Sequence, residues 1–255
     1  MYYTQGISQT LKTTLIALIL LISACSEESP QPKQLDAALK IHYLFIEEGK
    51  TGSARVRLRQ FMEEQGESAG ALFLMGFSYH KEKKYAKAVK WFTKSTSTDG
   101  EVYPPAFHFL GWGEYYLGDT GASKKAVQSF LEWYPDEGDT LFALGLIATD
   151  EGDLASSQQY FERAIASGNT TEEVQAKSKA RLADVFVERD EWSKAVELYE
   201  EALSHNPDLY EAWYRLSKVL LRMQKTDEAE KAFQEFQLSR RRVRPDLDQT
   251  TRFPE

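Results

Sequence analysis

One pattern recurs along most of the chain, with a period of about 34 residues. A small residue is followed four positions later by an aromatic residue or leucine, and usually by another small residue three positions after that. The clearest examples are Ala88, Phe92 and Ser95, then Ser157, Phe161 and Ala164, then Ala195, Tyr199 and Ala202. These spacings place the residues on one helix face, where small side chains let a neighbouring helix approach and the ring fills the remaining space. The pattern therefore predicts a stack of packed helices.

A second pattern precedes the first in each repeat and predicts a partner helix. It consists of Met75-Gly76 with Tyr79, Leu144-Gly145 with Ala148, and Leu182-Ala183 with Phe186. Short polar turns join the two predicted helices, and Pro207 follows the fifth pair, where a helix must end. Together the two patterns resemble the tetratricopeptide repeat, whose signature is W-x2-L-G-x2-Y, then A-x3-F, then P.

The resemblance implies an all-α fold, a right-handed superhelical solenoid of about six helix-turn-helix repeats. The expected units are 35–68, 69–102, 104–137, 138–171, 176–209 and 210–243, which make 35–243 one solenoid domain. The first unit is degenerate, with His42 at the glycine position. The third is irregular, because Ala126 and Phe130 fall three residues late. We expect its turn at 118–121 to be longer, and the sequence leaves its register open. The alternative is an unrelated antiparallel helical bundle.

The N-terminal segment, residues 1–24, has the features of a signal peptide. Lys12 supplies positive charge, residues 14–22 are apolar, and the apolar run is too short for a comfortable transmembrane helix. The segment ends Leu21-Ile22-Ser23-Ala24-Cys25, which resembles the bacterial lipobox. The resemblance implies that Cys25 is diacylated on its thiol and becomes the first residue of the mature protein. The alternatives are an ordinary secretory signal peptide or an uncleaved anchor with an incidental cysteine.

The residues that flank the expected solenoid indicate how it is attached. Residues 25–34 form the lipidated cysteine and a polar tether, of which nine residues span about 30 Å when extended. In lipoproteins of Gram-negative bacteria, an aspartate after the cysteine favours retention in the inner membrane. Ser26 therefore indicates the outer membrane, facing the periplasm, if the source is Gram-negative. Residues 244–255 form a C-terminal tail without helical periodicity.

The charge balance and the single cysteine exclude some classes of function. The formal net charge of −8 disfavours a nucleic-acid partner, because the chain repels phosphate backbones. The basic run at 240–244 is best interpreted as a helix end stabilised by the helix dipole. With Cys25 as the only cysteine, no disulfide can form within one chain.

No catalytic motif is present in the sequence, and we expect no enzyme activity, no cofactor and no metal. The chain has none of the HExxH, CxxC, GxSxG, GxxxxGK[ST] or GxGxxG patterns. Its four histidines, His42, His80, His108 and His205, are far apart. His80 and His108 could meet across adjacent units, but no clear third metal ligand accompanies them.

The resemblance also implies a concave groove lined by the first helix of each unit. The inward positions of the first four units are mostly aromatic: Tyr43, Phe73, Phe77, His80, His108, Trp112, Tyr115, Tyr116, Phe142 and Leu146. Those of the last two units are mostly charged: Lys177, Asp184, Glu188, Glu211, Tyr214, Lys218 and Arg222. Exposed aromatic side chains are common binding anchors. The alternative is that a tightly wound solenoid buries these rings in its core.

These observations predict a lipid-anchored scaffold of the cell envelope that binds a protein or peptide through its aromatic groove. Lipoproteins of this build assist the assembly of envelope complexes, and the chain resembles the type that assembles type IV pilus secretins in length, repeat number and anchor. The alternatives are a glycan- or lipid-binding envelope protein, or an adaptor for a periplasmic hydrolase or protease.

Overall fold

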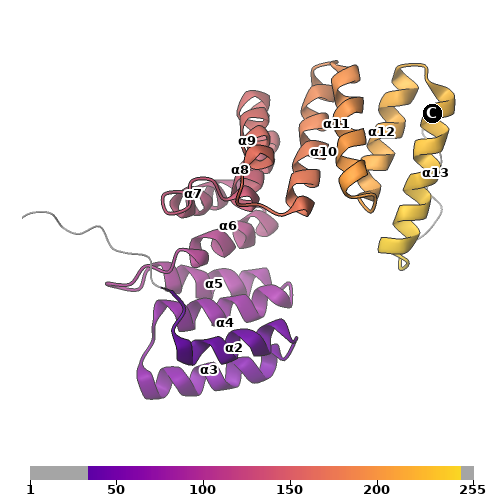
Figure 1. Cartoon of the computed structure of the whole chain (residues 1–255). Helices are drawn as coiled ribbons and strands as arrows, with labels where there is room; N and C mark the ends of the chain where they lie inside the picture. The colour runs from indigo at the N-terminus through magenta and orange to yellow at the C-terminus, as the bar shows by residue number, and fades with distance from the viewer. Residues whose placement is uncertain (1–33, 248–255) are drawn as a thin grey trace, which may run out of the picture.

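The computed structural model describes residues 34–247, and Figure 1 shows the arrangement of its helices. The twelve helices in this range are α2 (Ala37–Glu47), α3 (Thr51–Gln65), α4 (Ala69–Lys81), α5 (Tyr85–Thr96), α6 (Pro105–Leu117), α7 (Thr120–Leu131), α8 (Gly138–Asp150), α9 (Leu154–Ala166), α10 (Glu172–Glu188), α11 (Trp192–His205), α12 (Tyr210–Arg222) and α13 (Thr226–Val243). Consecutive helices form six pairs, from α2–α3 to α12–α13. The predicted all-α repeat fold is therefore confirmed.

The six pairs stack into a bent array rather than a straight one. In Figure 1 the helices of the first three units run across the direction of the helices in the last three. The buried apolar residues divide accordingly into a large cluster over α2–α6, another from α8 to α13, and a small one around Val127, Leu144 and Ile147 between them. The first helices, α4, α6, α8, α10 and α12, border one concave surface.

The repeat pattern works through close contact between a small residue on one helix and a ring on its partner. A Cβ atom added to Gly76 would lie 2.6 Å from the ring of Phe92, and one added to Gly145 would lie 2.4 Å from the ring of Phe161. Both rings are fully buried. A larger residue at either glycine would have to displace a packed ring, which explains the small residue at these positions.

The third unit differs from the expectation in its turn and in its register. Its turn is short, with Gly118 in the left-handed region at φ 85° and the side chain of Asp119 capping α7. Ser123 donates a hydrogen bond to the Gly111 carbonyl (2.8 Å), as Ser157 does to the Gly145 carbonyl (3.2 Å). The pattern is therefore Ser123, Val127 and Phe130, with a valine where most units carry a ring and the first carries Leu58. The expectation of a longer turn was wrong, and the structure defines the register that the sequence left open.

Two further boundaries depart from the simple repeat. The helix α10 begins at Glu172, four residues before the expected start of the fifth unit, because the Thr171 side chain accepts a hydrogen bond from the Val174 amide at 3.2 Å. In the first unit, His42 lies buried at the glycine position and contacts Phe61 edge to face, with ring centroids 6.2 Å apart. Neither the extra N-terminal turn of α10 nor the histidine at the glycine position of the first unit prevents its unit from forming a helix pair.

Candidate partner-binding groove

Seven of the ten predicted groove residues line a single open cavity of about 510 Å³ on the concave surface. We call this cavity the inner groove. The seven are His80, His108, Trp112, Tyr115, Tyr116, Phe142 and Leu146. They come from α4, α6 and α8, and residues of α10 and α12 complete the opposite side. The superhelical bend thus brings five first helices around one concavity.

The other three predicted residues, Tyr43, Phe73 and Phe77, lie outside the inner groove. Phe73 and Phe77 are 4% and 5% exposed and pack with Phe109 at centroid distances of 5.6 and 5.1 Å. Tyr43, half-exposed on α2, stacks flat on Phe77 at 5.7 Å. Phe142 is also mostly buried, at 8%, although one side of it reaches the groove. Phe73 and Phe77 are therefore core residues, as the alternative interpretation of the sequence held.

The most exposed aromatic side chain of the inner groove is Tyr116, which is 51% exposed. Its ring stacks on Tyr85, with centroids 4.4 Å apart, and on Trp112, with centroids 5.7 Å apart, and both interplanar angles are 25°. The two stacking contacts restrain the ring, so the exposed part of Tyr116 has little freedom to lose on binding.

Sequence reasoning missed two aromatic residues of this region, Tyr85 and Phe109. Tyr85 begins α5, the second helix of its unit, whereas the prediction considered only first helices. Phe109 lines the groove and packs on both His80 and His108, at 5.2 and 5.0 Å. It immediately precedes the Leu110-Gly111 pair and is not at one of the inward positions considered. That Phe109 lines the groove is therefore evident only from the structure.

A polar network joins the third and fourth units at the floor of the groove. His108 contacts the Thr140 hydroxyl through Nδ1 at 2.7 Å and the Asp139 carboxylate through Nε2 at 3.3 Å. The Trp112 indole donates to the same Asp139 oxygen at 2.9 Å. Burial raises the pKa of Asp139, but the hydrogen bonds from His108 and Trp112 outweigh it and leave the pKa below its ordinary value. Asp139 is therefore ionised, and through one carboxylate oxygen it holds both His108 and Trp112.

His80 is held in an apolar setting beside this network. Its ring contacts Tyr85, Phe109 and Tyr116, and its Nδ1 has no hydrogen-bond partner among the described residues. Burial, with a smaller contribution from His108, lowers the pKa of His80 to about 4. His80 is therefore neutral at pH 7. Within residues 34–247, no group of three or more His, Cys, Asp or Glu side chains is placed to hold a metal ion.

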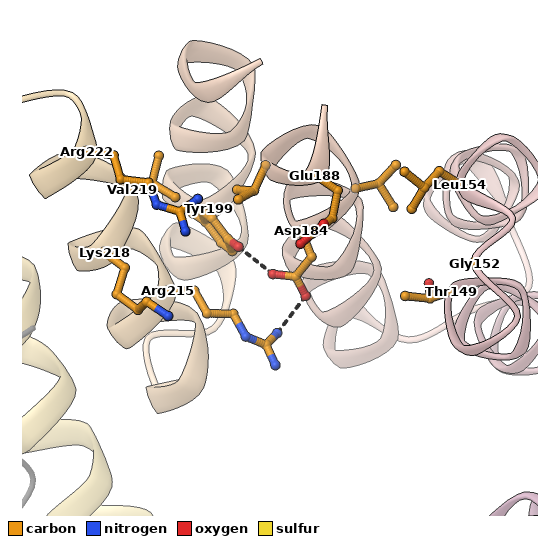
Figure 2. A pocket seen from close by; sticks show the side chains of 12 residues that line it. Thr149, Gly152, Leu154, Asp184, Glu188, Tyr199, Arg215, Lys218, Val219 and Arg222 are labelled. Carbon is orange, nitrogen blue, oxygen red and sulfur yellow. Dashed lines mark hydrogen bonds and ion pairs between the residues drawn. The ribbon is translucent and has the colours of Figure 1, made fainter. Parts of the chain in front are cut away.

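The charged half of the concave surface centres on Asp184 of α10, shown in Figure 2. Tyr199 of α11 donates its hydroxyl to one carboxylate oxygen, and Arg215 of α12 contacts the other at 2.7 Å. Arg181, one turn earlier on α10, shares that second oxygen at 3.3 Å. Burial, with the adjacent Asp184 charge, raises the pKa of Tyr199 far above its ordinary value, so the hydroxyl stays protonated.

Arg215 connects the inner groove with the rest of the charged half. It lines the inner groove, a second cavity of about 590 Å³ that also contains Asp184 and Arg222, and a third of about 530 Å³ beside Tyr214. Four of the predicted charged positions, Asp184, Glu188, Lys218 and Arg222, line the second cavity, and Lys177 and Glu211 line the inner groove. The three cavities are therefore parts of one continuous concave surface.

The predicted signal peptide, Cys25, the tether up to residue 33 and the tail from residue 248 lie outside the described residues. Among the helices between residues 34 and 247, none combines the length and the apolar character needed to cross a membrane. The described part of the tail, residues 244–247, contains an ion pair between Arg244 and Asp246 at 2.9 Å.

Comparison with known proteins identifies the family. Three family models for the tetratricopeptide repeat match the chain, at residues 69–101, 110–170 and 186–242, which together exceed half of its length. The chain therefore belongs to the tetratricopeptide repeat family. No curated protein sequence matches it.

Solved structures agree with this fold. PilF of Pseudomonas aeruginosa is 18% identical, with a TM-score of 0.67, and the match covers 83% of this chain and 92% of PilF. A tetratricopeptide repeat protein from Parabacteroides merdae is 16% identical, with a TM-score of 0.61 and coverage of 82% and 84%. YrrB, described as having an unusual peptide-binding site, is 14% identical, with a TM-score of 0.53 and coverage of 74% and 93%. At these identities the likeness concerns the fold alone.

Proposed function

We propose that the chain is a lipid-anchored scaffold of the cell envelope that binds a protein partner in the inner groove. The observation that carries the proposal is the exposed ring of Tyr116, held by stacking on Tyr85 and Trp112 at the concave surface. An exposed aromatic side chain of this kind is a frequent anchor in interfaces. The scaffold role is also the usual one for the tetratricopeptide repeat fold.

The groove suits an extended segment of a partner better than a compact ligand. It is open, and it continues through Arg215 into two further cavities. An extended chain can follow such a surface and place successive side chains into separate depressions. The description of YrrB as a peptide-binding protein is in keeping with this mode, although the likeness to YrrB concerns the fold alone.

The envelope location rests on the sequence around Cys25, which resembles a lipobox. Growing cells with an alkyne-bearing palmitate analogue tests it, because a lipidated Cys25 makes the protein fluorescent after coupling to a dye. The Cys25→Ala variant is expected to lose the label and to leave the outer-membrane fraction. Retention of the label by the variant would contradict the proposed anchor.

Affinity capture from the membrane fraction, quantified by mass spectrometry, tests the groove. We compare the wild type with a Trp112→Ala, Tyr116→Ala variant. The matched control is Val56→Ala, Leu238→Ala, which removes two exposed apolar side chains, 59% and 49% exposed, outside the groove. The proposal expects one envelope protein to be lost from the groove variant and kept by the control. Equal recovery from both variants would overturn it.

Within this class of function, we propose assembly of an outer-membrane complex, with the type IV pilus secretin as the first candidate. The support is architectural: PilF shares the fold over most of both chains. Deletion of the gene followed by measurement of secretin multimers in outer membranes tests this assignment. A glycan partner is the second candidate, because the flat face of Tyr116 also suits a sugar ring. Retention on purified cell-wall material without any protein would favour the glycan.

A further inference from the structure

Two arginines on the charged side of the inner groove share a single carboxylate. Arg215 and Arg181 contact the same oxygen of Asp184, at 2.7 and 3.3 Å, while the hydroxyl of Tyr199 occupies the other oxygen. A guanidinium carries five N–H donors, and each arginine uses one nitrogen on Asp184. Two positive charges thus face one negative charge, and most of the donors remain available.

Both arginines line the inner groove. Arg215 also lines the two neighbouring cavities, one of which contains Asp184, whereas Asp184 does not line the inner groove. Both arginine side chains are about one third exposed, at 37% and 32%, so they are reachable by a ligand and still partly shielded from water. An ion pair with a ligand is stronger in such a setting than on an open surface.

The two acidic residues of the groove differ in their setting. Asp139 contacts His108 and accepts a hydrogen bond from Trp112, whereas Glu211 lies exposed at the start of α12. Lys177, the remaining cation of the groove, is paired with Glu173 at 2.6 Å on its own helix. Arg181 and Arg215 are therefore the partly shielded cations of the groove that share one carboxylate, and they lie in the same cavity as Trp112 and the exposed Tyr116.

We propose that the groove recognises an extended segment in which a large apolar side chain lies close in sequence to an internal Asp or Glu. The apolar side chain packs on Tyr116 and Trp112, and the carboxylate binds Arg181 and Arg215 in the fork geometry that guanidinium groups favour. This inference rests on the proposed function and specifies its ligand. The carboxylate is internal because the concave surface continues beyond Arg215 on both sides, so the bound chain has no need to end there.

The test uses the full-length chain in detergent micelles and a phage library of random twelve-residue peptides. Because each peptide is fused to the coat protein through its C-terminus, the library has no free C-terminal carboxylate. Selection is expected to enrich Asp or Glu within a few residues of an aromatic or large aliphatic residue. The consensus peptide is then synthesised with an amidated C-terminus, and its affinity is measured by fluorescence anisotropy beside a version with Asn and Gln in place of the acids.

The acidic peptide is expected to bind at least tenfold more tightly than its amide version. Arg181→Gln, Arg215→Gln should abolish this difference, while Arg59→Gln, Arg241→Gln, which removes two exposed arginines elsewhere, should preserve it. Arg215→Lys, which keeps the charge but not the fork, should retain part of the preference. Circular dichroism establishes that each variant is folded.

Selection of peptides without acidic residues would overturn the inference, as would an acid preference that survives in the Arg181, Arg215 variant. A consensus peptide that binds only when it is resynthesised with a free C-terminal carboxylate, and not in its amidated form, would also overturn it. In each case the proposed function is judged separately, by whether the Trp112, Tyr116 variant loses the envelope protein. The inference can therefore fail while the scaffold role stands, and a failure of both is recognisable.

Discussion

The two halves of the solenoid, the first three units and the last three, share one packing pattern and differ in the side chains on their concave surface. In the first half, Gly76 lies against Phe92, and in the second, Gly145 lies against Phe161 in the same way. Yet the inner positions are aromatic around Trp112 and Tyr116 and ionic around Asp184 and Arg215. This difference indicates that the contacts between the two helices of a unit determine the fold. The side chains at the inward positions can then vary, and they determine which ligand is bound.

The comparison predicts first that the packing residues are equivalent in both halves. Phe92→Ala and Phe161→Ala each remove a fully buried ring, and each should lower the free energy of unfolding by about 3–5 kcal/mol. Tyr116→Ala, at a half-exposed position, should cost less than about 1 kcal/mol. Urea denaturation followed by circular dichroism measures all three. If either phenylalanine variant lost little free energy of unfolding, the shared packing pattern would not be what stabilises that half.

The second prediction concerns the loss of stability in acid that His80, in the aromatic half, should cause. The pKa of His80 is about 4 in the folded chain against an ordinary value of 6.5, so the unfolded chain takes up the proton first as the pH falls. Stability from the neutral ring is complete above pH 6.5 and is lost between pH 6.5 and 4, by up to about 3 kcal/mol.

The His80→Phe variant removes this titration without opening a cavity, and its stability should change less than that of the wild type across this pH range. His205→Gln, at an exposed site, serves as the control and should behave as the wild type does. Urea midpoints at pH 7, 5.5 and 4.5 provide the measurement. An unaltered acid dependence in His80→Phe would assign the effect to other groups.

The third prediction separates the two halves by their response to salt once a partner is known. Tyr116→Ala should weaken binding by about 2 kcal/mol at low and high salt alike, because it removes apolar contact. Arg215→Gln should weaken binding at low salt, and its deficit should shrink as salt screens the ion pair. Titrations at 0.05 and about 0.5 M NaCl test this, a range over which the screening length falls several-fold. Equal salt responses of the two variants would remove the distinction between the halves.

The smallest expected effect lies at the first contact between units. The Glu82 carboxylate accepts the Thr51 hydroxyl at 2.5 Å and pairs with Arg55 at 2.8 Å. Hydrogen bonds from Lys84, Thr51 and Arg55 lower the pKa of Glu82 from 4.5 to about 2, so its contribution is full above pH 4.5 and is lost as the pH falls towards 2.

Glu82→Gln should therefore cost about 1 kcal/mol at pH 7 and progressively less in acid. Glu63→Gln, at an exposed position on α3, is the control and should change stability little. Thermal unfolding monitored by circular dichroism at pH 7 and pH 3 measures the difference. A deficit in Glu82→Gln that is the same at both pH values would show that the ion pair is not its source.

Much of the fold could be predicted from the sequence, because the repeat imposes short-range rules. The spacing of Ala88, Phe92 and Ser95 is enough to define a helix face, and the helix pairs occur where the units were expected. The register of the third unit could not be assigned, because Val127 stands where most units carry a ring, and only the hydrogen bond from Ser123 to the Gly111 carbonyl reveals it.

The groove could be predicted only in part, for a different physical reason. Trp112 and Tyr116 line it as expected, since the direction of an inward position on a helix follows from the repeat. Whether a ring reaches the groove depends on what packs over it, and Tyr43 on α2 covers Phe77. The pairing of Arg181 and Arg215 on Asp184 joins two units and depends on the superhelical bend, which no local pattern contains.

Site-specific photo-crosslinking in living cells tests most directly the claim that the two halves form one binding surface. A photoreactive amino acid is placed at Tyr116 in the aromatic half, at Arg222 in the charged half, and at Gln159 as a control. Gln159 is exposed on α9 and lines none of the three cavities. We expect the same envelope protein to crosslink at Tyr116 and Arg222 and not at Gln159. Crosslinking at Gln159 alone, or different proteins at Tyr116 and Arg222, would contradict the account.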